Sequence, residues 1–299
     1  MRTGAVTKAE LERTRNKSAS DLSSYECSLV AKQAGGLLQS VELVQRARTC
    51  LEATTVRDPT YAETWADLVN VLFDQHKSGM GLPSPEAQDI DRRAYLVPRM
   101  MDAAKRAVEL APQSLRAHFA LFFAYWAACQ PERMRVEAET IQAINPNDIE
   151  GLLTGYGLIL AGDAEYGRQL AQKGLALAGP AAPPFFWGAI GDYYTQKGEW
   201  AESLQYYRKA YTDSWVDHMR LIIVLAHLGR IHEARAEVPV ALKLRPDMSV
   251  HEYDRWVRLF CISDDWRQQI ATGLRLGGMR EEANANRAPQ SDAAASPKP

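Results

Sequence analysis

The sequence predicts an all-α solenoid of about six helical hairpins, closed by C-terminal capping helices. One observation is the stretch 187–215, which reads as a complete pair of helices with small residues where the helices cross. Another is a recurrence of prolines at a step of 34 residues, from Pro112 to Pro146 and from Pro146 to Pro180. Such a period is typical of stacked helical repeats, in which each hairpin buries its apolar face against the next.

The residues that define one repeat are either small, at the crossing of the two helices, or aromatic, beside that crossing. A large side chain at the crossing would push the two backbones apart. In the fifth repeat the defining residues are Trp187, Gly191, Tyr194, Ser203, Tyr207 and Ala210, and Trp65 takes the tryptophan position of the second repeat. This spacing resembles the signature of a tetratricopeptide repeat. The resemblance implies a right-handed superhelix whose concave face is lined by the first helix of each hairpin.

The hairpins follow one another along the chain. They are expected over residues 25–57, 60–110, 115–146, 149–180, 187–215 and 215–246. The step from Pro180 to Pro246 is 66 residues, close to two repeats, and the step from Pro59 to Pro112 is 53, which is one repeat plus an insertion. Glycines and prolines break the helical pattern within that insertion. The second helix of the second repeat is expected to begin after it, at Arg99.

The expected domain organisation has four parts. A charged linker helix occupies residues 1–24, and the solenoid spans 25–246 with its insertion at 76–98. Two helices in 247–280 cover the last apolar face, because a solenoid has no further repeat there. Residues 281–299 are small, polar and proline-bearing, which predicts a disordered tail.

Composition excludes several classes of function. The net charge of −2 provides no basic surface for nucleic acid. No apolar run approaches the roughly 18–20 residues of a membrane span, and the N-terminus lacks the apolar core of a signal peptide. The four cysteines, Cys27, Cys50, Cys129 and Cys261, form no CxxC pair. This pattern predicts buried free thiols in a cytoplasmic protein and argues against a disulfide or zinc framework.

No catalytic chemistry is predicted. The six histidines form neither an HExxH motif nor a zinc-ligand spacing. His118 and His218 fall at the position that Trp187 holds in the fifth repeat, so packing explains them better than catalysis. Glycines at 155 and 157 lie inside a helical pattern and do not complete a phosphate-binding loop. We therefore expect no enzyme activity, no cofactor and no metal site.

The expected function is binding of a protein or peptide in the concave groove. First-helix positions that would face this groove are Asn70, Phe73, Arg116, Phe119, Phe123, Trp126, Phe185 and Asp192. The aromatic residues of the third repeat could anchor an apolar partner segment. The alternative is that they are buried against neighbouring helices or the insertion at 76–98. Ala66 and Ala127 stand where a clamp for a C-terminal carboxylate would need polar groups, so no such clamp is expected.

A second resemblance rests on three stretches, residues 8–33, 56–68 with the insertion after them, and 244–281. They are similar to the C-terminal repeat region of bacterial class III adenylate cyclase-like and winged-helix regulators. In that family an effector domain precedes the repeats, whereas only seven residues precede Lys8 here. The resemblance implies, as an alternative function, a stand-alone regulatory module that acts on a separate effector. Self-association into a homo-oligomer is also compatible with the pattern.

Overall fold

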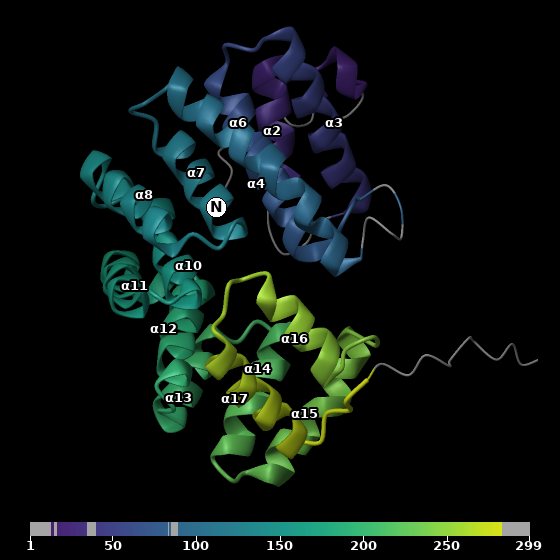
Figure 1. The fold of residues 1–299 in the computed structure, drawn as a ribbon, viewed down its shortest axis with the longest axis vertical. Coiled ribbons are helices and arrows are strands. Elements are labelled where there is room, and N and C mark those ends of the chain that lie inside the picture. Colours follow the sequence, from purple (N-terminus) through teal and green to yellow (C-terminus); the bar gives the residue numbers. More distant parts are fainter. Residues whose placement is uncertain (1–12, 15–16, 35–39, 83, 85–88, 283–299) are drawn as a thin grey trace, which may run out of the picture.

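The computed structural model describes residues 13–14, 17–34, 40–82, 84 and 89–282. Every regular element among these residues is a helix (Figure 1). Most of the linker helix expected over 1–24 and most of the tail expected over 281–299 lie outside the described residues.

Six consecutive helical hairpins make up the body of the chain. They are α2 (Ser24–Ala34) with α3 (Val41–Arg57), α4 (Ala62–Ser78) with α6 (Leu96–Leu110), α7 (Leu115–Ala127) with α8 (Pro131–Ile144), α10 (Thr154–Ala161) with α11 (Ala164–Ala178), α12 (Pro184–Gln196) with α13 (Trp200–Ala210), and α14 (Trp215–His227) with α15 (Ile231–Leu244). The short helices η1 (Ala19–Asp21), α9 (Ile149–Leu152) and η3 (Gly179–Ala181) precede or connect them. The prediction of an all-α chain of consecutive helical hairpins is confirmed.

The turns inside the hairpins share one backbone feature. Two residues after α7, α12 and α14 end, the chain adopts a positive φ. Glycine fills this position after α12 and α14, with φ of 72° at Gly198 and 74° at Gly229. Cys129 fills it after α7, with φ of 52°. Since a side chain disfavours the left-handed region, Cys129 is an unexpected residue at this turn.

Small residues allow the two helices of a hairpin to cross closely. A Cβ atom on Gly191 of α12 would lie 2.4 Å from the ring of Tyr207 on α13. The hydroxyl of Ser203 donates to the carbonyl of Gly191 at 3.0 Å, across the same crossing. The aromatic ring of Tyr207 therefore occupies the space that the glycine leaves open.

Replacement of Gly191 by alanine is expected to lower the free energy of unfolding by about 1–3 kcal/mol, because overpacking at Tyr207 displaces a buried ring. Urea unfolding followed by circular dichroism measures the change. Gln205→Ala, at an exposed position of α13, is the control, because this side chain lies outside the crossing. Equal effects of the two variants would contradict this packing.

The C-terminal helices do more than cover the last repeat. Helix α17 (Asp264–Leu276) packs on α14, as expected of a capping helix. Helix α16 (Val250–Arg258) lies between α14 and the N-terminal hairpins (Figure 1). Its Trp256 ring is 4.8 Å from the Trp215 ring of α14, and its Arg255 lies 2.8 Å from Asp91 of η2 (Ile90–Tyr95) in the insertion. The C-terminal end of the solenoid thus folds back onto its N-terminal half.

Candidate interaction groove

Four aromatic residues that were predicted to line the groove do come together. Phe73 comes from α4, and Phe119, Phe123 and Trp126 come from the adjacent first helix, α7. The ring of Phe123 lies 4.4 Å from both Phe73 and Phe119, and the rings of Phe73 and Trp126 are 5.3 Å apart. Phe73 and Trp126 are buried, whereas Phe119 and Phe123 are half-buried. We call these four residues the aromatic groove.

Residues 259–262, which follow α16, lie against the aromatic groove; we call them the docked segment. The indole N–H of Trp126 donates to the carbonyl oxygen of Phe260 at 3.1 Å, and the two rings are 5.9 Å apart. The ammonium group of Lys77, at the end of α4, donates to the carbonyl oxygen of Leu259. Two side-chain donors of the solenoid therefore hold the main chain of the docked segment.

Lys77 is surrounded by aromatic rings. Its Nζ atom lies 4.0 Å from the ring centre of Phe260 and 4.7 Å from those of Phe73 and Trp126. Burial lowers the pKa of Lys77 well below its ordinary value. The rings and the carbonyl of Leu259 oppose this effect, because both stabilise an ammonium group. Helical spacing gave no sign of this lysine, since it lies beyond the expected end of its helix.

The four cysteines form two disulfides, Cys27–Cys50 between α2 and α3, and Cys129–Cys261 between the α7–α8 turn and the docked segment. The expectation of free thiols is therefore wrong. It relied on the absence of closely spaced cysteine pairs, whereas these bridges join residues 23 and 132 positions apart. Only the folded chain brings such cysteines together.

Two of the other predicted groove residues, Arg116 and Phe185, contact neighbouring side chains of the fold. Arg116 forms an ion pair with the buried Asp67 of α4. Burial raises the pKa of Asp67, and the guanidinium of Arg116 opposes that rise. The side-chain oxygen of Asn70 is buried and has no hydrogen-bond partner among the described residues. Phe185 packs at 4.4 Å on Phe186 of the same helix, away from the aromatic groove.

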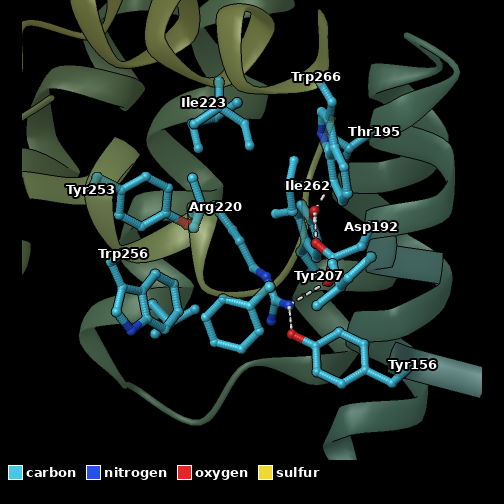
Figure 2. Close-up of a pocket in the computed structure, with 15 residues that line it drawn as sticks. Tyr156, Asp192, Thr195, Tyr207, Arg220, Ile223, Tyr253, Trp256, Ile262 and Trp266 are labelled. Carbon is cyan, nitrogen blue, oxygen red and sulfur yellow. Dashed lines mark hydrogen bonds and ion pairs between the residues drawn. The ribbon is translucent and has the colours of Figure 1, made fainter. Parts of the chain in front are cut away.

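Asp192 belongs to a second cluster, deeper in the C-terminal half (Figure 2). Its carboxylate accepts from Arg220 Nη2 at 2.5 Å and from the hydroxyl of Tyr207 at 2.6 Å, and Arg220 also donates to Tyr156 at 3.1 Å. Burial raises the pKa of Asp192, against the effect of Arg220 and Tyr207. Burial also raises the pKa of Tyr156 to about 12.

The cavity beside this cluster is small. Side chains of α14, α16 and α17 line it, including Trp266, whose buried indole N–H has no hydrogen-bond partner among the described residues. Its volume is about 40 Å³, room for roughly one to three water molecules. This is far below the roughly 300–1,000 Å³ of a typical small-molecule site. The arrangement therefore fits a buried structural ion pair better than a ligand site.

His118 and His218, which occupy the position that Trp187 holds in the fifth repeat, each contact a glutamate on the second helix of their own hairpin. His118 Nδ1 lies 2.7 Å from Glu137 of the paired second helix, and His218 Nδ1 lies 2.6 Å from Glu237. The side chains of His118 and Glu137 are 10% and 11% exposed, so both groups are largely out of water. Each histidine thus fastens the two helices of its hairpin.

The His118–Glu137 pair should make stability depend on pH. The hydrogen bond that the His118 ring donates to the Glu137 carboxylate raises the pKa of His118 above its ordinary 6.5. The pair therefore stabilises the fold fully below about pH 6.5, and this contribution is lost as pH rises through the folded-state pKa. We expect His118→Gln to flatten the fall in unfolding free energy between about pH 6 and pH 9. His251→Gln, at an exposed position, is the control, and an unchanged slope in His118→Gln would contradict the coupling.

None of the helices that the structure describes is both long and apolar enough to span a bilayer. Among the described residues, no three His, Cys, Asp or Glu side chains are grouped so that they could hold a metal ion.

Comparison with known proteins places two solved structures beside this chain. TTC0263, a thermophilic tetratricopeptide repeat protein of Thermus thermophilus, is similar over 85% of this chain and 100% of its own, with a TM-score of 0.45 and 17% identity. Yeast Tom70 is similar over 88% of this chain and 60% of its own, with a TM-score of 0.49 and 12% identity. No protein-family model and no curated protein matches the sequence.

Proposed function

We propose that the chain is a non-enzymatic scaffold that binds a protein or peptide segment in the aromatic groove. The observation that carries this proposal is the docked segment itself. Lys77 and Trp126 hold it through the carbonyl oxygens of two consecutive residues in a turn, which any peptide that adopts this turn can offer. The ring of Phe260 supplies the apolar contact. Recognition of main-chain groups combined with one pocketed side chain is a recurrent mode of peptide binding.

Peptide display against the immobilised full chain, with and without a thiol reductant, tests this function. We expect enrichment of sequences in which an aromatic residue follows an aliphatic one, as Phe260 follows Leu259. Phe123→Ser, which removes a half-buried ring of the groove, should abolish the enrichment. Val136→Ser is the matched control, because this residue is 58% exposed on α8. Enriched peptides that bind the Phe123→Ser variant equally well would contradict the proposal.

The second candidate is a stand-alone regulatory module that acts on a separate cyclase-like or transcriptional effector. Occupation of the groove by the chain's own segment favours it, because a regulated module needs a state in which its binding surface is closed. Reconstitution with an effector encoded beside it tests this candidate. A change in effector activity that depends on Phe123 would support it, and an unchanged activity would exclude it.

We propose the cytoplasm as the compartment on the sequence alone, but the two disulfides remove the argument from free thiols. Lasting disulfides are typical of oxidising compartments, and those of the cytoplasm are usually transient or redox-sensing. Fractionation combined with alkylation of thiols before lysis distinguishes these cases. Recovery of the chain outside the cytoplasm, with its cysteines in disulfides and therefore not alkylated, would overturn the cytoplasmic proposal.

A further inference from the structure

We propose that the Cys129–Cys261 disulfide locks the docked segment into the aromatic groove, and that its reduction opens the groove to a partner segment that adopts the same turn and carries an aromatic residue. This inference rests on the proposed function, because the partner would take the same place and the same donors as the docked segment. The partner class follows from the chemistry of residues 259–262, which are leucine, phenylalanine, cysteine and isoleucine.

The bridge joins the groove to its occupant beside their points of contact. Cys129 lies three residues after Trp126 in the chain, and Cys261 directly follows Phe260. Trp126 and Phe260 are the two residues that share a hydrogen bond of 3.1 Å and a ring contact. The bridge links residues that are 132 positions apart. It therefore restrains the distance between the groove and the docked segment, and does not merely close a local turn.

The backbone at Cys129 indicates that this cysteine is present for its sulfur. The equivalent turns carry Gly198 and Gly229, which adopt the same left-handed conformation without a steric cost. Cys129 adopts it at φ of 52°, and its partner Cys261 adopts a positive φ of 62°. A turn that required only its shape would be served better by glycine. The cysteine carries this steric cost, and the bridge is what offsets it.

The two disulfides differ in their access to a reductant. Cys27 and Cys50 are both 0% exposed, whereas Cys129 is exposed. A dithiol reductant can therefore attack the sulfur of Cys129 and form a mixed disulfide with it, while Cys261 leaves as a thiolate and takes up a proton. The second thiol of the reductant then attacks the reductant's own sulfur in the mixed disulfide, and Cys129 is released as a thiol. The dithiol is oxidised by two electrons, and the bridge is reduced by two.

The contacts that remain after reduction can be exchanged for those of a partner. Lys77 and Trp126 hydrogen-bond only main-chain carbonyl oxygens of the docked segment, so a partner peptide in the same turn offers them the same acceptors. Arg255 pairs with Asp91, whose side chain is 75% exposed, and such exposed pairs contribute little. Loss of the bridge lowers the effective concentration of the tethered segment at the groove. A partner can then compete for the site.

The experiment uses the full chain and a fluorescent synthetic peptide that copies residues 256–263, with serine in place of Cys261. Fluorescence polarisation measures its binding to the oxidised chain, to the chain treated with a mild dithiol, and to a Cys129→Gly variant. Mass spectrometry of alkylated protein confirms that Cys27–Cys50 stays intact. Cys129→Gly restores the residue of the equivalent turns, so it removes the bridge without disturbing the turn. Hydrogen exchange of residues 255–263 reports release of the docked segment.

We expect peptide binding to be at least tenfold tighter for the reduced chain and for Cys129→Gly than for the oxidised chain, with faster hydrogen exchange in both. Equal binding to oxidised and reduced chains would overturn the lock and leave the peptide-binding function standing. Release of the segment without peptide binding would overturn the partner assignment and, with it, the proposed function. Unchanged hydrogen exchange after reduction would overturn the lock by itself.

Discussion

Replacement of Arg220 by methionine is expected to lower the free energy of unfolding by about 3–5 kcal/mol, because it leaves the Asp192 carboxylate buried without its counter-charge. The two side chains are only 15% and 7% exposed, so water cannot replace the guanidinium. Tyr207 would remain as a hydrogen-bond donor to Asp192, but a neutral donor does not compensate the charge. Urea unfolding of the full chain measures this loss.

The loss should also depend on pH. Without Arg220, the pKa of Asp192 rises further above its ordinary value, because burial then acts unopposed by that charge. An acid whose pKa is raised in the folded state favours folding at low pH and loses that contribution as pH rises through the folded-state pKa. The Arg220→Met variant should therefore recover stability when pH is lowered toward the pKa of unfolded aspartate, near 3.9.

Two further variants separate the buried charge from general damage. Combining Arg220→Met with Asp192→Leu should restore most of the loss, since apolar side chains can replace a buried ion pair at little cost. Arg230→Met removes the ion pair with Glu233, whose two side chains are 37% and 54% exposed, and should cost far less than Arg220→Met. If Arg220→Met costs no more than Arg230→Met, the buried pair does not stabilise this fold.

The hairpin body of the fold could be predicted from the sequence because its signals are local. Small residues at helix crossings and prolines at a fixed period depend only on neighbours one hairpin away. The predicted ends of the helices are less accurate than the predicted hairpins. Pro98 suggested a boundary before Arg99, yet α6 begins at Leu96. A proline in the first turn of a helix loses no hydrogen bond, because the first amide groups have no partner within the helix.

The candidate groove was predictable only in part. Phe73 and Phe123 meet because they lie on adjacent first helices, and a repeat pattern fixes that adjacency. The docked segment and the buried Lys77 were missed, because their contacts cross 134 residues for Trp126 and Phe260 and 182 for Lys77 and Leu259. No periodicity connects such positions. One signal was available in the sequence: at Cys129 a cysteine stands where the equivalent turns have glycine.

Loss of the Cys129–Cys261 bridge is also expected to have a large effect on the stability of the folded chain. Under a chain-entropy model, a disulfide that closes a loop of 132 residues stabilises the folded chain by about 4–5 kcal/mol. Both Cys129→Ser and Cys129→Gly should lose this contribution in urea unfolding, while far-ultraviolet circular dichroism stays close to that of the wild type. The hairpins should keep their helical content because the bridge joins no two helices of one hairpin.

The two variants should nevertheless differ from each other. Serine keeps a side chain at a backbone position with φ of 52°, whereas glycine adopts that conformation freely. Cys129→Gly should therefore be more stable than Cys129→Ser by about 1 kcal/mol. A serine variant as stable as the glycine variant would show that the turn carries no steric cost, and the explanation of why a cysteine stands there would fail. If both variants kept the stability of the wild type, the bridge would not restrict the unfolded chain as the chain-entropy model requires.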